Sequence, residues 1–72
     1  MKTTREILQT CDEKGLSVGI SRLHQPNDAD AWAGRINPPG VYDVGTLRTA
    51  ASFDLAVQAA WDAYDAVYGG VA

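Results

Sequence analysis

The chain has 72 residues, of which 46% are hydrophobic and 21% charged, the composition of an ordinary globular domain rather than a disordered segment. Its formal net charge of −3 makes it a small acidic protein, and the charges form no basic patch of the kind that binds nucleic acid through charge alone. The single cysteine, Cys11, excludes an intramolecular disulfide framework and a cysteine-based zinc site.

Length and hydropathy predict one domain spanning residues 1–72. The apolar runs are too short to cross a membrane and no signal-peptide pattern opens the chain, so we expect a soluble, cytoplasmic (intracellular) protein without a membrane partner. A domain of this size buries only roughly 60% of the surface of its unfolded chain and is therefore marginally stable. Burial of further surface against a partner would stabilise it.

A first helix is predicted over residues 4–14. Thr3 and Glu6 have the spacing of a capping box, in which the threonine hydroxyl and the glutamate carboxylate each accept a hydrogen bond from a backbone N–H of the first turn. Apolar residues follow at helical spacing. Lys14 and Gly15 then supply the cation and the glycine that favour a helix C-terminus.

Three strands are predicted next, at about residues 16–23, 29–36 and 41–47. In the first two segments apolar and small residues alternate with a period of two, and we expect Trp32 to face the helices. The third segment follows a turn formed by Asn37-Pro38-Pro39-Gly40, but Gly45 interrupts its alternation and leaves its register open.

The last helix is predicted at about residues 53–68 and has the clearest pattern in the chain. Ser52 is a favourable N-cap residue and Asp54 places a negative charge in the first turn. Apolar residues cover a wide face, and Gly69-Gly70 provides the C-terminal stop.

These elements predict an α+β fold of the order αβββα. Short connections favour a three-stranded antiparallel meander. Both helices are expected on one face of the sheet, because only that face has large apolar residues to bury. The other face, called here the outer face, is then expected to stay open.

The order and length of the elements resemble the double-stranded-RNA-binding domain. The segment from Gly45 to Tyr68, with Ala50-Ala51-Ser52 before its helix and Ala59-Ala60 inside it, is similar to the last strand and helix of that family. The resemblance implies the αβββα topology and a nucleic-acid-binding function. That family has phosphate-binding lysines at the start of the helix, where this chain has Phe53-Asp54-Leu55.

The small size, the acidic charge and the alanine-rich C-terminal helix also resemble small accessory proteins of bacteriophages and prophages. Anti-CRISPR and other anti-defence proteins are among them. This resemblance implies a non-enzymatic protein that inhibits a host defence protein.

The sequence contains no pattern that predicts catalysis, a cofactor or a bound metal. Cys11 lies on the apolar side of a predicted helix and His24 lies in a linker, so they do not form a nucleophile with its base. There is no second histidine to complete a metal site. Asn27, Asp28 and Asp30 resemble the start of a calcium loop but lack its later glutamate. We expect no enzymatic activity and no cofactor.

The outer face of the predicted sheet is the first candidate binding surface. Its side chains are small, whereas a solvated sheet more often carries long charged or threonine side chains, and arginines border it. A surface of this kind lets another protein approach closely. The candidate residues are Ser17, Gly19, Ser21, Ala31, Ala33, Arg22 and Arg35.

A second candidate is the polar stripe of the last helix, formed by Asp54, Asp62 and Asp65. It is either a solvated helix face or an acidic surface that binds a basic partner. Trp32 and Trp61 are either core residues or interface anchors.

The primary functional hypothesis is a protein-interaction module that binds an unidentified protein partner or forms a homodimer. The alternative is a nucleic-acid-binding module that uses these basic residues: Arg22, Arg35 and Arg48, with Lys2 and Arg5. The absence of lysines at the start of the last helix favours the protein partner.

Overall fold

The computed structural model describes residues 2–23, 31–42 and 44–69. It confirms the αβββα order and the α+β class. A π-helical turn, η1, continues the last helix. The elements are α1 (Thr4–Lys14), β1 (Ser17–Arg22), β2 (Trp32–Asn37), β3 (Arg48–Ala50), α2 (Phe53–Tyr64) and η1 (Asp65–Gly69).

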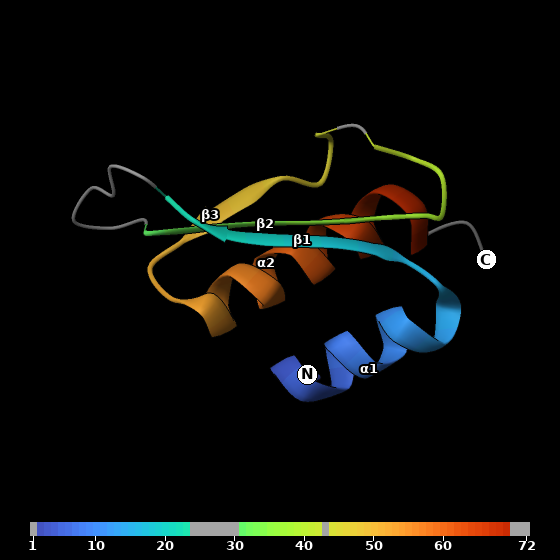
Figure 1. Ribbon diagram of the computed structural model, residues 1–72, viewed down its shortest axis with the longest axis horizontal. Coiled ribbons are helices and arrows are strands. Elements are labelled where there is room, and N and C mark those ends of the chain that lie inside the picture. The colour runs from blue at the N-terminus through green and yellow to red at the C-terminus, as the bar shows by residue number, and fades with distance from the viewer. Residues whose placement is uncertain (1, 24–30, 43, 70–72) are drawn as a thin grey trace.

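The three strands form one antiparallel sheet in the order β1-β2-β3. Figure 1 shows the sheet nearly edge-on, with α1 and α2 together on one side and the connection from β2 to β3 on the other. β1 pairs with β2 over six residue pairs, from Ser17 opposite Asn37 to Arg22 opposite Trp32. β3 pairs with β2 over only three, from Trp32 opposite Ala50 to Gly34 opposite Arg48.

Helix α1 has the predicted bounds and both predicted end signals. The Thr3 hydroxyl accepts a hydrogen bond from the Glu6 N–H at 3.2 Å, and the Glu6 carboxylate accepts one from the Thr3 N–H at 3.0 Å. Gly15 ends the helix at φ 68°, where glycine avoids the steric cost of a side chain.

The third strand is not at residues 41–47, as predicted, but at Arg48–Ala50. One turn ends where the predicted segment begins, and in it the Val41 N–H donates to the Pro38 carbonyl at 3.1 Å. A second turn lies inside the segment, and in it the Leu47 N–H donates to the Val44 carbonyl at 3.1 Å.

Thr46 explains why backbone pairing begins so late. Continuing the β2–β3 register would place Thr46 opposite Ile36. The Thr46 side chain, rather than its backbone, bonds to Ile36. Its hydroxyl accepts a hydrogen bond from the Ile36 N–H at 3.2 Å and donates one to the Ile36 carbonyl at 2.8 Å. The Asn37 Oδ1 atom lies 3.0 Å from the same hydroxyl. A side chain thus occupies the place of a ladder residue, and both Asn37 and Thr46 are buried.

Helix α2 begins at the predicted cap, where the Ser52 hydroxyl accepts a hydrogen bond from the Leu55 N–H at 3.2 Å. The regular α-helix ends at Tyr64, four residues before the predicted end at 68. The π-helical turn η1 covers the remainder of the predicted helix.

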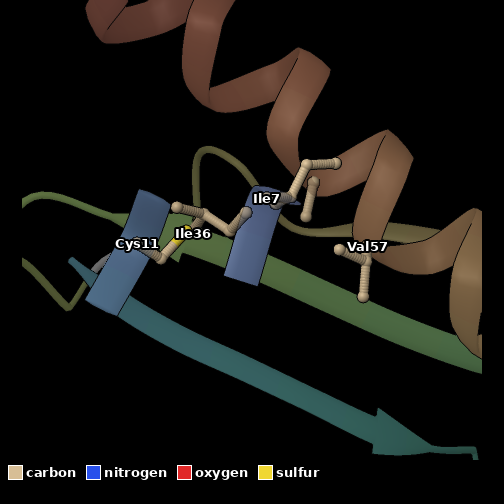
Figure 2. Packing of buried hydrophobic residues seen from close by; sticks show 5 residues of the cluster. Ile7, Cys11, Ile36 and Val57 are labelled. Atoms are coloured by element: carbon tan, nitrogen blue, oxygen red, sulfur yellow. The ribbon is translucent and has the colours of Figure 1, made fainter. Parts of the chain in front are cut away.

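The core lies between the two helices and β2. Figure 2 shows Ile7 and Cys11 of α1 and Val57 of α2 gathered around Ile36 of β2. These four side chains and Ala60 are at most 1% exposed. Full burial of an aliphatic side chain of this size contributes about 1.5–3 kcal/mol. The core therefore holds both helices to the same face of the sheet.

Gly34 brings α2 close to β2. A Cβ atom at this position would lie 3.0 Å from the Ala56 carbonyl oxygen and 2.8 Å from the Ile20 side chain. Trp32, on the same face, packs edge-on against Phe53 at the start of α2, with ring centroids 5.6 Å apart. The prediction that Trp32 faces the helices is confirmed.

Candidate functional site

The outer face of the sheet is built from the alternate residues that point away from the helices. Across β1 and β2, Gly19 pairs with Arg35 and Ser21 pairs with Ala33. Ser21 is exposed, and Gly19 and Arg35 are partly exposed. Ser17, opposite Asn37, is also partly exposed.

A pocket of about 300 Å³ opens on this face. It includes four of the predicted surface residues. Its three other lining residues were not predicted as surface residues: Ile20, and Val44 and Leu47, which are 66% and 42% exposed. The lining is Gly19, Ile20, Ser21, Ala33, Arg35, Val44 and Leu47.

The expectation of a wholly open outer face is therefore wrong. The connection from β2 to β3 lies on this side of the sheet (Figure 1). Its Thr46 hydroxyl is 3.0 Å from the side chain of Asn37, the buried last residue of β2. Ala33 was expected to be open, but its side chain is only 8% exposed. The outer face is a pocket bordered by Val44 and Leu47 rather than a flat surface.

The three arginines grouped by sequence do not share one face. Arg35 belongs to the outer face, and its side chain crosses Gly19, where a Cβ atom would lie 3.1 Å from Arg35 Nε. Arg22 and Arg48 pair with Trp32 and Gly34, residues of the helix-covered face. Arg48 donates to the Leu47 carbonyl at 2.7 Å.

Ala31 lies just outside the regular strands and links their ends. Its carbonyl accepts from the Leu23 N–H at 2.8 Å, and its N–H donates to the Ala50 carbonyl at 2.9 Å. Its role in the structure is thus a backbone one at the end of the sheet, and it does not line the pocket.

The acidic stripe lies on the helix layer and not on the outer face. Asp54 and Asp62 are exposed residues of α2, and Asp65 is an exposed residue at the start of η1. The Asp65 carboxylate lies against Gly69, the last residue of η1. The two candidate surfaces are on opposite sides of the molecule.

An aromatic row follows the C-terminal half of the helix layer. Trp61 stacks on Tyr64 with ring centroids 5.5 Å apart, and Tyr64 lies 5.5 Å from Tyr68. The ammonium group of Lys2 is 6.0 Å from the centroid of Trp61. Trp61 and Tyr64 also pack against the core cluster, so Trp61 has a clear structural role.

Cys11 is buried, and desolvation raises the pKa of its thiol, which disfavours the nucleophilic thiolate. His24, Asn27, Asp28 and Asp30 lie outside the described residues. Within residues 2–23, 31–42 and 44–69, three or more His, Cys, Asp or Glu side chains nowhere gather as metal ligands would. In the same ranges no helix has the length and apolarity needed to traverse a bilayer.

Comparison with known proteins returns no significant match to any protein family, curated protein or solved structure.

Proposed function

We propose that this chain is a non-enzymatic protein-interaction module that binds its partner through the outer face of the sheet. The observation that carries the proposal is the pocket of about 300 Å³ bordered by the exposed side chains of Val44 and Leu47. Its floor is formed by small residues of β1 and β2, so a partner side chain would reach the sheet backbone.

The exposed leucine and valine support the proposal because burying them would gain free energy. Transfer of apolar surface out of water contributes roughly 25 cal/mol per Å². In a domain with so small a core, that gain is a substantial fraction of the total stability. Arg35, at the side of the pocket, adds a charged group that confers orientation and specificity.

We further propose that the partner is a host defence protein and that the chain is one of the small accessory proteins of bacteriophages and prophages. Size, acidic charge and element order support this finer proposal. The neighbours of the gene test it, since phage structural or anti-defence genes are expected beside it.

A matched pair of leucine variants tests the binding face. Leu47→Glu places a charge in the wall of the pocket, and Leu55→Glu makes the same change on α2, on the opposite side of the sheet. Both leucines are exposed, at 42% and 55%, so both variants are expected to fold. The partner is captured from host lysate with the wild-type protein and purified, and its affinity for each variant is measured.

We expect Leu47→Glu to weaken binding at least about tenfold and Leu55→Glu to leave the affinity unchanged. Equal binding by Leu47→Glu and wild type would contradict the proposal and direct attention to Asp54, Asp62 and Asp65.

Nucleic-acid binding remains the alternative, but the division of Arg22, Arg35 and Arg48 between two faces gives it little support. Salt dependence separates the two functions. Phosphate neutralisation releases counterions, so binding to RNA or DNA would fall steeply with salt, whereas an interface of mixed polarity responds modestly. Titration of labelled duplex RNA in low and high salt makes this comparison.

A further inference from the structure

β1 is an edge strand whose outer side is unpaired by the described residues. Exposed strand edges are usually protected by a proline, a bulge, a central charge or short length. β1 has none of these, because it runs through six consecutive pairs with β2 and its only charged residue is Arg22, the last one. β3, at the other edge, is only three residues long.

The hydrogen bonds show which residues of β1 have free backbone groups. The Leu23 N–H donates to the Ala31 carbonyl, its register partner, and hydrogen-bonded residues alternate along an antiparallel ladder. The odd-numbered residues of β1 therefore bond to β2. The backbone groups of Val18, Ile20 and Arg22 point to the open edge.

Arg35 lies above this same edge. Its side chain extends from β2 across Gly19, with Nε 3.1 Å from the position of a Cβ atom there. It makes no hydrogen bond or ion pair with any residue in the described parts of the chain. A strand added beside β1 would lie about 4.8 Å beyond Gly19, within reach of the guanidinium group.

We propose that the partner adds an extended segment to the edge of β1, with an aspartate or glutamate opposite Gly19 that pairs with Arg35. This inference rests on the proposed function and specifies its mode. Main-chain hydrogen bonds to Val18 and Ile20 supply affinity, and the carboxylate selects the register. Glycine at position 19 is what allows the arginine to cross β1, since any side chain there would displace it.

Selection from a displayed library of short random peptides tests the proposal without a known partner. Two variants remove the two recognition elements. Arg35→Gln removes the cation, and Val18→Pro removes the outward N–H, a substitution that an edge strand tolerates. The matched controls are Arg22→Gln, which removes an arginine from the other face, and Val18→Ala, which keeps the N–H. Circular dichroism establishes that each variant is folded.

Selected peptides are expected to share an acidic residue at a fixed position among residues of high β propensity. Arg35→Gln and Val18→Pro should each lower their affinity at least about tenfold, and the two controls should change it less than about twofold. Peptides without a common acidic residue, or binding that Arg35→Gln leaves unchanged, would overturn the proposal.

Two further outcomes separate this inference from the proposed function. Peptides that lose affinity for Leu47→Glu but bind Val18→Pro and Arg35→Gln normally would leave binding at the outer face intact and overturn strand addition. A dimer in sedimentation that Val18→Pro dissociates would identify a second copy as the occupant of the edge, and would overturn the acidic partner.

Discussion

The helix-covered face of the sheet carries Ile36, which is fully buried among α1 and α2, whereas the outer face carries Arg35, one residue earlier, partly exposed and with no partner among the described residues. The two side chains are adjacent in sequence, and the pleat alone sends them to opposite sides. Thus one strand supplies both the centre of the core and the side of the candidate binding pocket.

In this small domain the core that supplies stability lies on one face of the sheet, and the candidate binding pocket lies on the other. On the inner face, Ile36 is fully buried against α1 and α2, and Gly34 lies close to the Ala56 backbone. On the outer face, the connection from β2 to β3 takes the place of a helix (Figure 1). A substitution on the inner face should therefore lower the stability much more than a similar substitution on the outer face.

The largest contrast is expected from introducing a charge. Val57→Asp or Ala60→Asp places an unpaired carboxylate at a fully buried position, which costs more than the roughly 3–5 kcal/mol that a core of this size supplies. We expect neither protein to fold. Ser21→Asp, on the exposed outer face, should retain the wild-type circular dichroism spectrum and a cooperative thermal transition. A folded Val57→Asp protein would show that the faces are assigned incorrectly.

Two glycines on opposite faces provide a milder version of the same contrast. Gly34→Ala would place a Cβ 3.0 Å from the Ala56 backbone oxygen, which cannot move without shifting α2, and should cost about 3 kcal/mol. Gly19→Ala would meet only the flexible side chain of Arg35 and should cost less than about 1 kcal/mol. Urea denaturation of both variants measures the difference, and equal losses would contradict it.

Thr46 tests the boundary between the two faces. Thr46→Val keeps the shape of the side chain but removes the hydroxyl that satisfies the backbone of Ile36, leaving a buried N–H and carbonyl without that partner. We expect a loss of about 2 kcal/mol. Thr46→Ser, which retains the hydroxyl, should recover part of it, and denaturant midpoints that rank the two variants in reverse would exclude the proposed role.

Periodicity and capping predicted most of this architecture. Thr3, Glu6 and Ser52 located the starts of both helices, and the alternation in the second strand placed Trp32 on the helix-covered face. In the first strand, the same period of two continues one residue beyond Ser21 and places Arg22 on the helix-covered face. The assignment of Arg22 to the outer face was therefore an error that the sequence itself could have prevented.

The position of β3 was not predictable in the same way. Thr46 replaces a ladder residue with its side chain, and a single hydroxyl leaves no periodic signal. The pocket depends on this arrangement, since Val44 and Leu47 border it only because the chain turns twice before pairing. In the sequence, only the apolar residues between Gly40 and β3 indicate that this connection contributes to a pocket.

Removing the N-cap of α2 should lower the free energy of unfolding less than a substitution in the core does. Ser52→Ala removes the hydroxyl that accepts from the Leu55 N–H and should cost about 1 kcal/mol without altering the fold. Ser52→Asp, which retains an acceptor, is the control. A denaturation midpoint unchanged by Ser52→Ala would show that the cap contributes nothing to stability.

The smallest effect is expected at the exposed start of α1, as a dependence on pH. Hydrogen bonds to the Glu6 carboxylate, first from the Thr3 backbone and then from its side chain, hold the pKa of Glu6 below its ordinary value of 4.5. Because the folded-state pKa is the lower one, this contribution is complete above the unfolded-state value and is lost as pH falls through the lowered value.

Glu6→Gln isolates that contribution. The difference in urea midpoint between wild type and Glu6→Gln should be constant near neutral pH and shrink as the pH falls below about 4.5, where the wild-type carboxylate becomes protonated. Glu13→Gln, at the other end of the helix, measures the general effect of removing a charge. A difference that grows on acidification would mean that the folded state binds the Glu6 proton more tightly than the unfolded chain does. The capping box would then not be the interaction that holds the carboxylate ionised at the start of α1.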